Sequence, residues 1–160
     1  MKKVKEVMID SPFYCLGRES LQLVAKQMSA ANINSLPVVD KNNKVIGILG
    51  ELDICMAFSD EKNYPLSDLL VENAMQREVF TCSPDDNLAD ALRMMRENRV
   101  GRLVVEEEET LIGIITLAQV VKKLYGTNEE SMQDTGKENV LKTLYTLAEN
   151  KPKEFTSVSV

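Results

Sequence analysis

Short apolar runs alternate along the chain with longer apolar stripes at helical spacing. The runs at residues 13–16, 36–39 and 44–49 are bounded by turn residues and predict strands. Between the first two runs, apolar residues recur at i, i+3, i+4 and i+7, which predicts an amphipathic helix. These residues are Leu21, Val24, Ala25 and Met28. A lead-in helix over residues 4–8 and a closing helix over 51–58 complete the set, so the pattern predicts a β-α-β-β-α unit.

The second half of the chain shows the same order of apolar runs and stripes. A lead-in helix is expected over residues 66–75 and a closing helix over 117–125. Strands are expected over residues 80–82, 103–105 and 111–115. This half therefore predicts a second β-α-β-β-α unit.

The long helix of the second unit has a clear apolar stripe and a candidate start. Its apolar positions are Leu88, Ala91, Leu92 and Met95. Ser83 followed by Pro84, with an acidic residue three positions after the serine, is typical of a helix N-terminus. We therefore expect this helix to begin immediately after Ser83.

The two halves are an internal repeat. Displacing the chain by 67 positions superposes equivalent residues in order: Val4 on Val71, Met8 on Met75, Phe13 on Phe80, Cys15 on Cys82, Leu21 on Leu88, Met28 on Met95, Leu36 on Leu103 and Val38 on Val105. One residue is lost in the next turn, after which Ile46, Gly47 and Ile48 superpose on Ile112, Gly113 and Ile114. Ordered matches of this kind indicate a tandem duplication.

The duplication predicts how the chain divides into domains. Residues 1–58 form a first unit, residues 59–70 a linker and residues 71–125 a second unit. Residues 126–160 form a polar tail with one amphipathic helix at about 137–149, which we expect to pack on this protein's own module or on a second subunit rather than on a foreign partner. Units of this size bury too little surface to be stable alone, so we expect them to share a core.

Composition and charge exclude several classes of protein. An apolar content of 44 % suits a globular domain, and no apolar run approaches the ~20 residues of a membrane span. The charged N-terminus lacks the apolar stretch of a signal peptide, and the widely spaced cysteines favour the reducing cytoplasm. A net charge of −6 argues against a general nucleic-acid or membrane-surface binder.

The residue types that usually carry catalysis are missing from the sequence or have structural interpretations. The chain has no histidine, which excludes Ser-His and Cys-His catalysis and zinc sites of the Cys/His type. Cys15 and Cys82 fall in equivalent predicted strands and are interpreted as buried thiols, with a disulfide or redox pair as the alternative. The acidic run Glu106–Glu109 is interpreted as a solvated hairpin turn that discourages edge pairing, with a cation site as the alternative.

The duplicated unit resembles the CBS domain, named after cystathionine β-synthase, and two units in tandem resemble a Bateman module. The resemblance covers about 120 of the 160 residues and rests on Leu36-Pro37-Val38-Val39-Asp40 and Ile46-Gly47-Ile48 within the duplication. It implies an α+β fold in which two units pack through their sheets with pseudo-twofold symmetry. It also implies two clefts at the seam, where many members of the family bind AMP, ADP, ATP or S-adenosylmethionine.

The resemblance places the family's ligand-binding motif on the first cleft. That motif is Gly-h-h-Thr/Ser-x-x-Asp, where h is apolar, the hydroxyl meets phosphate and the carboxylate meets ribose. The first cleft takes Ile48, Gly50 and Asp53 from one unit, with Phe80, Gly101 and Arg102 from the other. The carboxylate is present as Asp53. Gly50 replaces the hydroxyl, and the guanidinium of Arg102 offers a bidentate phosphate contact in its place.

The second cleft has the opposite departure from the motif. It takes Ile114, Thr116 and Gln119 from the second unit, with Phe13, Asn34 and Ser35 from the first. The hydroxyl is present as Thr116, but Gln119 replaces the carboxylate and offers only weaker neutral hydrogen bonds. The first cleft is therefore the better candidate.

Structural roles without a ligand are the alternatives for these residues. Asp53 is then an exposed helix residue, and Arg102 is a surface residue or an ion-pair partner of nearby acids. Thr116 is then a helix N-cap, a role that threonine fills for structural reasons alone. Phe13 and Phe80 are then ordinary core residues.

We expect a non-enzymatic regulatory module that binds an adenosyl-type ligand, with no required cofactor. The alternative is a CBS-fold dimerisation scaffold whose clefts have lost their ligands. The resemblance implies a homodimer. We expect its output to pass through an effector protein or the tail helix. The net charge and the short apolar runs argue against nucleic acid and membrane insertion. The candidate dimer faces are Leu52-Ile54-Cys55-Met56-Phe58 and Val120-Val121-Leu124.

Overall fold

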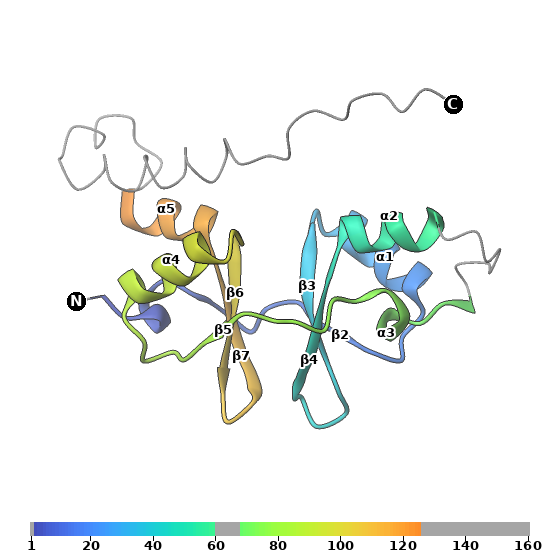
Figure 1. Ribbon diagram of the computed structural model, residues 1–160, viewed down its shortest axis with the longest axis horizontal. Coiled ribbons are helices and arrows are strands. Elements are labelled where there is room, and N and C mark those ends of the chain that lie inside the picture. The colour runs from blue at the N-terminus through green and yellow to red at the C-terminus, as the bar shows by residue number, and fades with distance from the viewer. Residues whose placement is uncertain (1, 60–67, 126–160) are drawn as a thin grey trace.

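The computed structural model describes residues 2–59 and 68–125, which form two β/α units side by side (Figure 1). The first part of the chain contains η1 (Val4–Glu6), β1 (Ile9–Asp10), β2 (Cys15–Leu16), α1 (Leu21–Ala30), β3 (Ser35–Val39), β4 (Val45–Gly50) and α2 (Glu51–Ser59). The second contains α3 (Val71–Ala74), β5 (Thr81–Cys82), α4 (Leu88–Glu97), β6 (Arg102–Glu107), β7 (Thr110–Thr116) and α5 (Leu117–Tyr125). The predicted tail helix and most of the predicted linker lie outside the described residues.

Each unit is built on a small mixed sheet with its long helices at one end. One sheet has the order β2-β3-β4 and the other β1-β7-β6-β5. In both sheets the hairpin is antiparallel, and a short strand, β2 or β5, pairs in parallel with it. Strand β1 pairs antiparallel with β7 at the other edge of its sheet. Helices α1 and α2 lie over one sheet and α4 and α5 over the other, with both hairpins pointing away from them (Figure 1). This arrangement confirms the predicted α+β tandem repeat.

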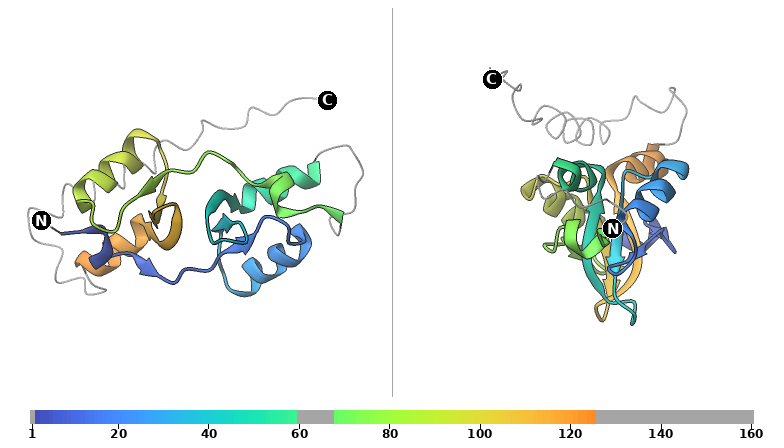
Figure 2. Two further views of the ribbon diagram at one scale, coloured as in Figure 1. Left: turned by 90° about the horizontal axis from the view of Figure 1, so that it is seen from below. Right: turned by 90° about the vertical axis from the view of Figure 1, so that its right-hand side faces the viewer.

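The lead-in segments are exchanged between the two units. Val4 and Val7 are fully buried in a core with residues of α4, β6 and β7, so the N-terminal segment packs on the second unit. Val71 and Met75 pack in the core of α1, β3 and β4 in the first unit. The chain then crosses between the units along two opposite sides (Figure 2). Each core is therefore completed by the other half of the repeat, which the sequence did not predict.

The exchange is fixed by backbone hydrogen bonds at equivalent positions. The N–H of Leu88 at the start of α4 donates to the Lys2 carbonyl at 2.9 Å, and the N–H of Leu21 at the start of α1 donates to the Leu69 carbonyl at 2.8 Å. Helix N-termini leave unpaired N–H groups, and here the exchanged segment supplies an acceptor.

The two sheets meet at a small apolar seam, which confirms that the units pack through their sheets. Val39, Val104 and Leu111 are buried together there. Below them the hairpins bond symmetrically: the Val45 N–H donates to the Glu109 carbonyl at 3.2 Å, and the Leu111 N–H donates to the Asn43 carbonyl at 3.1 Å. This pair of bonds follows the pseudo-twofold relation of the repeat.

The acidic hairpin turn makes one ion pair with the other unit. Lys44 Nζ lies 2.7 Å from Glu109 Oε2, and this hydrogen bond raises the pKa of Lys44. Both side chains are exposed, so the pair contributes little to stability. No cluster of three or more metal-ligating side chains occurs in the described part of the chain, this turn included.

Several predicted boundaries are wrong in detail. Helix α4 begins at Leu88 with Asn87 as its N-cap, because residues 83–86 form a separate turn in which the Ser83 N–H donates to Asp86 Oδ2 at 2.8 Å. The lead-in helices shrink to η1 and α3, a single turn each. The strand predicted over residues 13–16 is the shorter strand β2, which contains only Cys15–Leu16, and the Phe13 side chain is exposed to solvent.

The two predicted dimer faces are only partly exposed. Ile54 and Val120 are buried in the cores of their own units, so they are wrong as interface residues. Leu52, Cys55 and Met56 are exposed on α2. The prediction for Phe58 concerns a side chain outside the described part of the structure.

The cysteine prediction is confirmed for Cys15 and Cys82, which are free, buried thiols in equivalent strands. Burial raises the pKa of each to about 12, with a smaller contribution from Glu19 at Cys15 and from Asp86 and Glu106 at Cys82. The thiolate is the reactive form, so both groups are inert near neutral pH.

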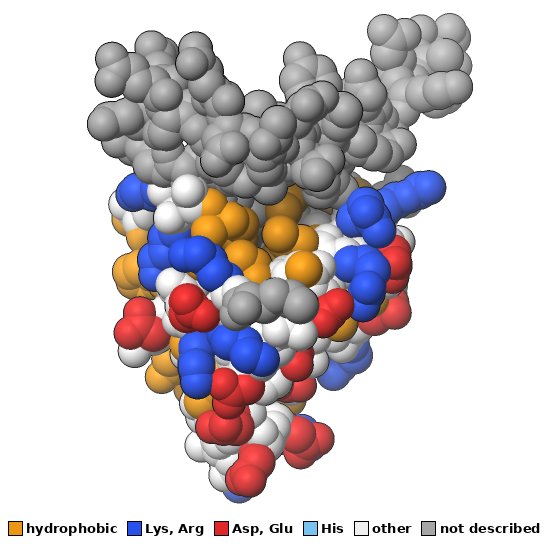
Figure 3. All heavy atoms as spheres, turned by 90° about the vertical axis from the view of Figure 1, so that its left-hand side faces the viewer, with side chains coloured by type: hydrophobic (Ala, Val, Ile, Leu, Met, Phe, Trp, Pro, Cys, Tyr) orange, Lys and Arg blue, Asp and Glu red, His pale blue; other side chains and the backbone are white. Residues whose placement is uncertain are grey.

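The end of the second unit carries basic and acidic side chains mixed together rather than in one patch of a single sign (Figure 3). In the second unit and the N-terminal segment packed on it, Arg93 pairs with Asp90 and Lys5 pairs with Asp85, each at 2.7 Å. Across residues 2–59 and 68–125, no helix has the length and apolarity required to span a bilayer.

Candidate functional site

A cavity of about 360 Å³ opens between the two units, next to the N-terminus of α2. The six residues predicted for the first cleft all line it: Ile48, Gly50, Asp53, Phe80, Gly101 and Arg102. The remaining lining residues are Asn34, Ser35, Glu51, Leu52, Gln76, Glu78, Val79 and Val100. The structure thus gathers residues that are up to 68 positions apart (34 to 102) around a single space.

Asp53 fixes the backbone at the N-terminus of α2 through side-chain hydrogen bonds. Its Oδ2 accepts a hydrogen bond from the Gly50 N–H at 2.7 Å, and its Oδ1 accepts one from Gln76 Nε2 at 2.8 Å. The side chain is half-buried rather than exposed, so the description of Asp53 as a plain exposed helix residue is wrong. Both carboxylate oxygens therefore bond to residues that line the cavity.

Arg102 crosses the seam and bonds to the first unit. Its Nη1 donates to Ser35 Oγ, and its Nη2 donates to Asn34 Oδ1 at 3.2 Å. Burial lowers the pKa of the guanidinium, while the charge of Glu51 acts in the opposite direction. Because its hydrogen-bond partners are neutral, the arginine keeps a charge in the cavity that no bonded carboxylate neutralises.

Apolar side chains supply two walls of the same space. Ile48 comes from β4 of the first unit, while Phe80 and Val100 come from the second. Phe80 also packs against the second core, so its core role and its place in the cavity coexist. Apolar walls with a few convergent polar groups are the usual construction of a small-molecule site.

The second predicted cleft is not assembled in the same way. Phe13 is 70 % exposed, so its interpretation as a core residue is wrong. Ile114 is buried and pairs with Ile9 of β1. Asn34 and Ser35, predicted for this cleft, line the first cavity instead, where they bond to Arg102.

Thr116 and Gln119 form a helix cap. The Thr116 hydroxyl accepts a hydrogen bond from the Gln119 N–H at 3.1 Å at the start of α5, which confirms the N-cap interpretation of Thr116. In the first unit the bond runs the other way, from the Gly50 N–H to the Asp53 carboxylate. A full capping box has both bonds, so each unit keeps a different half of it. The missing hydroxyl at Gly50 and the missing carboxylate at Gln119 are therefore the two complementary halves of one capping box.

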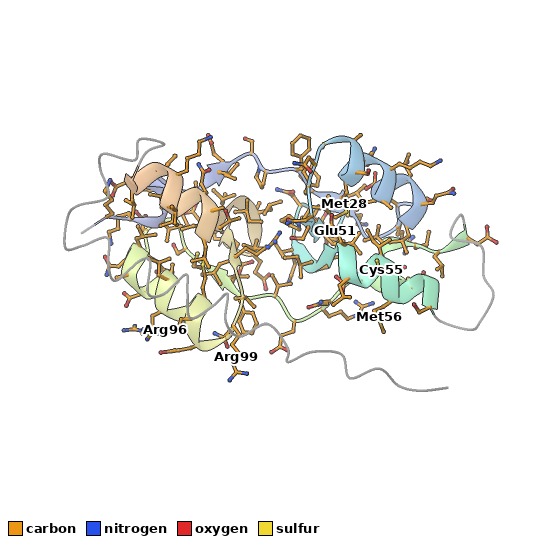
Figure 4. The ribbon with its side chains drawn as sticks, turned by 90° about the horizontal axis from the view of Figure 1, so that it is seen from above. Met28, Glu51, Cys55, Met56, Arg96 and Arg99 are labelled. Carbon is orange, nitrogen blue, oxygen red and sulfur yellow. The ribbon has the colours of Figure 1, made fainter. Side chains whose placement is uncertain are left out.

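Sequence reasoning missed three polar residues of the cavity: Glu51, Gln76 and Glu78. Glu51 stands at the inner end of α2, and Cys55 and Met56 lie further along the same helix (Figure 4). Gln76 is placed by the exchange of the lead-in segments, since its N–H and carbonyl both pair with Ile48 at 2.9 Å. That pairing is equivalent to Ile9 with Ile114, and the repeat was the one sequence signal for it.

Fold and cavity together define a pair of small α+β units related by pseudo-twofold symmetry. The family model for the CBS domain matches residues 4–60 and 67–126, and the chain therefore belongs to the CBS domain family. The uncharacterized protein MJ1232 of Methanocaldococcus jannaschii is 35 % identical over 80 % of this chain. The inosine-5′-monophosphate dehydrogenase of the same organism is 32 % identical over 77 % of this chain.

These two relatives are longer proteins. The match covers 40 % of MJ1232 and 24 % of the dehydrogenase. Among solved structures, the CBS domain pair of protein MJ0100 in complex with 5′-methylthioadenosine and S-adenosyl-L-methionine is similar to this chain with a TM-score of 0.66 and 25 % identity. That similarity covers 76 % of this chain and 98 % of the MJ0100 chain.

Proposed function

We propose that this protein is a regulatory module that binds an adenosyl-type ligand in the cavity between its two units. The observation that carries the proposal is the meeting of Asp53, Arg102 and Phe80 around one space. A carboxylate accepts hydrogen bonds from ribose hydroxyls, and charge-assisted bonds of this kind are strong. A guanidinium matches a phosphate or carboxylate group. The apolar walls suit a purine ring.

The family and the relative MJ0100 support the same class of ligand. The MJ0100 pair is described in complex with two adenosyl compounds, and it has 25 % identity with this chain. In the present chain the ribose partner is Asp53, whose Gln76 contact is made through an exposed amide. A ligand that displaces Gln76 and bonds to Arg102 would touch both units at once. It would thereby favour one arrangement of the units, which is the proposed regulatory mechanism.

A thermal titration tests the proposal. AMP, ADP, ATP, NAD and S-adenosylmethionine are each added at about 5 mM to the full chain, and unfolding is followed by circular dichroism. A ligand present at about 100 times its dissociation constant adds ~2.7 kcal/mol, which raises the midpoint by roughly 5–11 °C for a chain of this size. A shift with none of the five compounds would support a ligand-free scaffold instead.

The proposal includes a homodimer formed through the exposed face of α2. Leu52 is 70 % exposed and also lines the cavity, so a partner on this face would sense its occupancy. Met56 extends the same apolar face by one helical turn (Figure 4). The chain would signal through this surface to its effector protein.

We expect Met56→Glu to shift the protein from dimer to monomer in sedimentation velocity, because charges at the core of an interface are strongly disfavoured. Leu23→Glu, on the exposed side of α1, is the matched control and is expected to leave the dimer intact. Equal sedimentation of wild type and Met56→Glu would refute the α2 interface.

A further inference from the structure

The side chains that line the cavity carry more negative charge than positive charge. Glu51, Asp53 and Glu78 all line it, and Arg102 is the one cation among its fourteen described lining residues. The formal charge of the lining is therefore −2, from three carboxylates and one guanidinium. Like charges brought together in a partly enclosed site repel, and the repulsion grows with each added charge on a ligand.

The N-terminus of α2 offers less to an anion than a helix start usually does. The Gly50 N–H is already bonded to Asp53 Oδ2, and the Glu51 N–H donates to the Asn34 carbonyl at 3.1 Å. Gly50 has no hydroxyl to add. Two of the backbone N–H groups that would bind a phosphate are thus bonded to protein acceptors, and one of these acceptors is the negatively charged carboxylate of Asp53.

Arg102 can neutralise one anionic group. Its two terminal nitrogens point to Ser35 and Asn34, neutral partners that a ligand oxygen can replace without leaving a carboxylate unpaired. One planar guanidinium binds one phosphate bidentately. No second lysine or arginine is present in the described lining to receive another phosphate.

We infer that this cavity selects adenosine ligands that carry no more than one phosphate group and discriminates against nucleoside polyphosphates. The inference rests on the proposed function and narrows its ligand class. AMP, with one phosphate, and 5′-methylthioadenosine, with none, fit the selection. ATP places two further phosphates near Glu51 and Glu78 without a matching cation.

Calorimetric titration of the full chain with AMP, 5′-methylthioadenosine and ATP tests the inference. The titrations are made at about 150 mM salt, once with EDTA and once with Mg²⁺, because a divalent ion can bridge phosphates and carboxylates. We expect the tighter of the first two ligands to bind at least about tenfold more tightly than ATP in EDTA, and we expect Mg²⁺ to reduce this difference in affinity by bridging the phosphates of ATP to the carboxylates.

The double variant Glu51→Gln/Glu78→Gln should bind ATP more tightly. The ratio of the dissociation constant of ATP to that of the tighter of the other two ligands should therefore fall several-fold. Both side chains are exposed and the Glu51 backbone bond is retained, so folding should be unaffected. Glu97→Gln/Glu108→Gln makes the same change of net charge at exposed positions that do not line the cavity, and should leave the ratio unchanged.

Three results would overturn the inference. ATP binding as tightly as the better of the other two ligands would refute the selection while leaving the proposed function standing. An unchanged ratio in Glu51→Gln/Glu78→Gln, or an equal change in the control, would refute its electrostatic cause. Binding of none of the three ligands would refute the inference, and it would refute the proposed function as well if none of the five compounds in the thermal titration shifts the unfolding midpoint.

Discussion

Deletion of residues 1–10 is expected to lower the free energy of unfolding by about 3–6 kcal/mol, although these residues lie far in sequence from the unit they stabilise. The deletion removes Val4 and Val7, which are fully buried in the core of the second unit. Fully burying one such side chain contributes about 1.5–3 kcal/mol. It also removes strand β1 from the edge of β7.

The size of this effect matters because small domains are stable by only about 5–15 kcal/mol. The segment also pairs its backbone with the second unit, since the Val4 N–H donates to the Asp86 carbonyl and the Lys5 N–H to the Pro84 carbonyl, both at 3.0 Å. We therefore expect the second unit of the truncated chain to unfold at a much lower urea concentration.

Urea unfolding followed by circular dichroism measures the effect. The double variant Val4→Ala/Val7→Ala in the full-length chain should reproduce a large part of the loss, and Lys2→Ala, at an exposed side chain, should change the free energy by less than about 0.5 kcal/mol. An unfolding midpoint unchanged by the deletion would mean that the lead-in segment does not belong to the second core.

The second large effect is expected at Gly47, where Gly47→Ala should destabilise the fold by about 3 kcal/mol. A Cβ at this position would lie 2.5 Å from Met75 Sδ and 2.8 Å from the Gln76 carbonyl oxygen. The first contact can relax by rotation of the methionine, but the second is with backbone that is itself paired to Ile48. Overpacking of this kind costs about 1–3 kcal/mol or more.

Gly101→Ala is the matched control for this substitution. No atom lies within 4 Å of a Cβ built at Gly101, so its stability should be unchanged or slightly raised. Gly113, which is equivalent to Gly47 in the repeat, has the same close approach: the Ile9 carbonyl oxygen lies 2.8 Å from the position of a Cβ built on Gly113. Equal urea midpoints for Gly47→Ala and Gly101→Ala would contradict the packing described here.

The periodic elements of the fold were predictable because local packing alone fixes them. The stripe of Leu21, Val24 and Met28 gave α1, and its repeat gave α4. The exchange of lead-in segments was not predictable in this way. Val4 and Val71 are equivalent apolar residues, and periodicity shows that each is buried but not in which of the two cores.

The same limit explains the errors at the site. Asp53, Gly50 and Arg102 follow from the family motif and its position in the repeat. Ser35 and Arg102 are equivalent residues at the starts of β3 and β6, and equivalence suggested that they belong to opposite clefts. The structure brings them into contact across the seam, so both line one cavity. Glu51 and Glu78 carry no sequence signal, since isolated glutamates are common on any surface.

Calorimetric titration of AMP and 5′-methylthioadenosine into wild type and Asp53→Asn tests the central claim, that the Asp53 carboxylate meets a ligand's ribose. Asparagine can still accept the Gly50 N–H through its carbonyl oxygen, so the fold should be preserved. The loss of a hydrogen bond to a charged group costs about 1.5–3 kcal/mol, which predicts at least about tenfold weaker binding of the ligand that wild type binds more tightly. Gln119→Ala, at the equivalent position, should change that affinity by less than about threefold. Binding to Asp53→Asn as tight as to wild type would contradict the account.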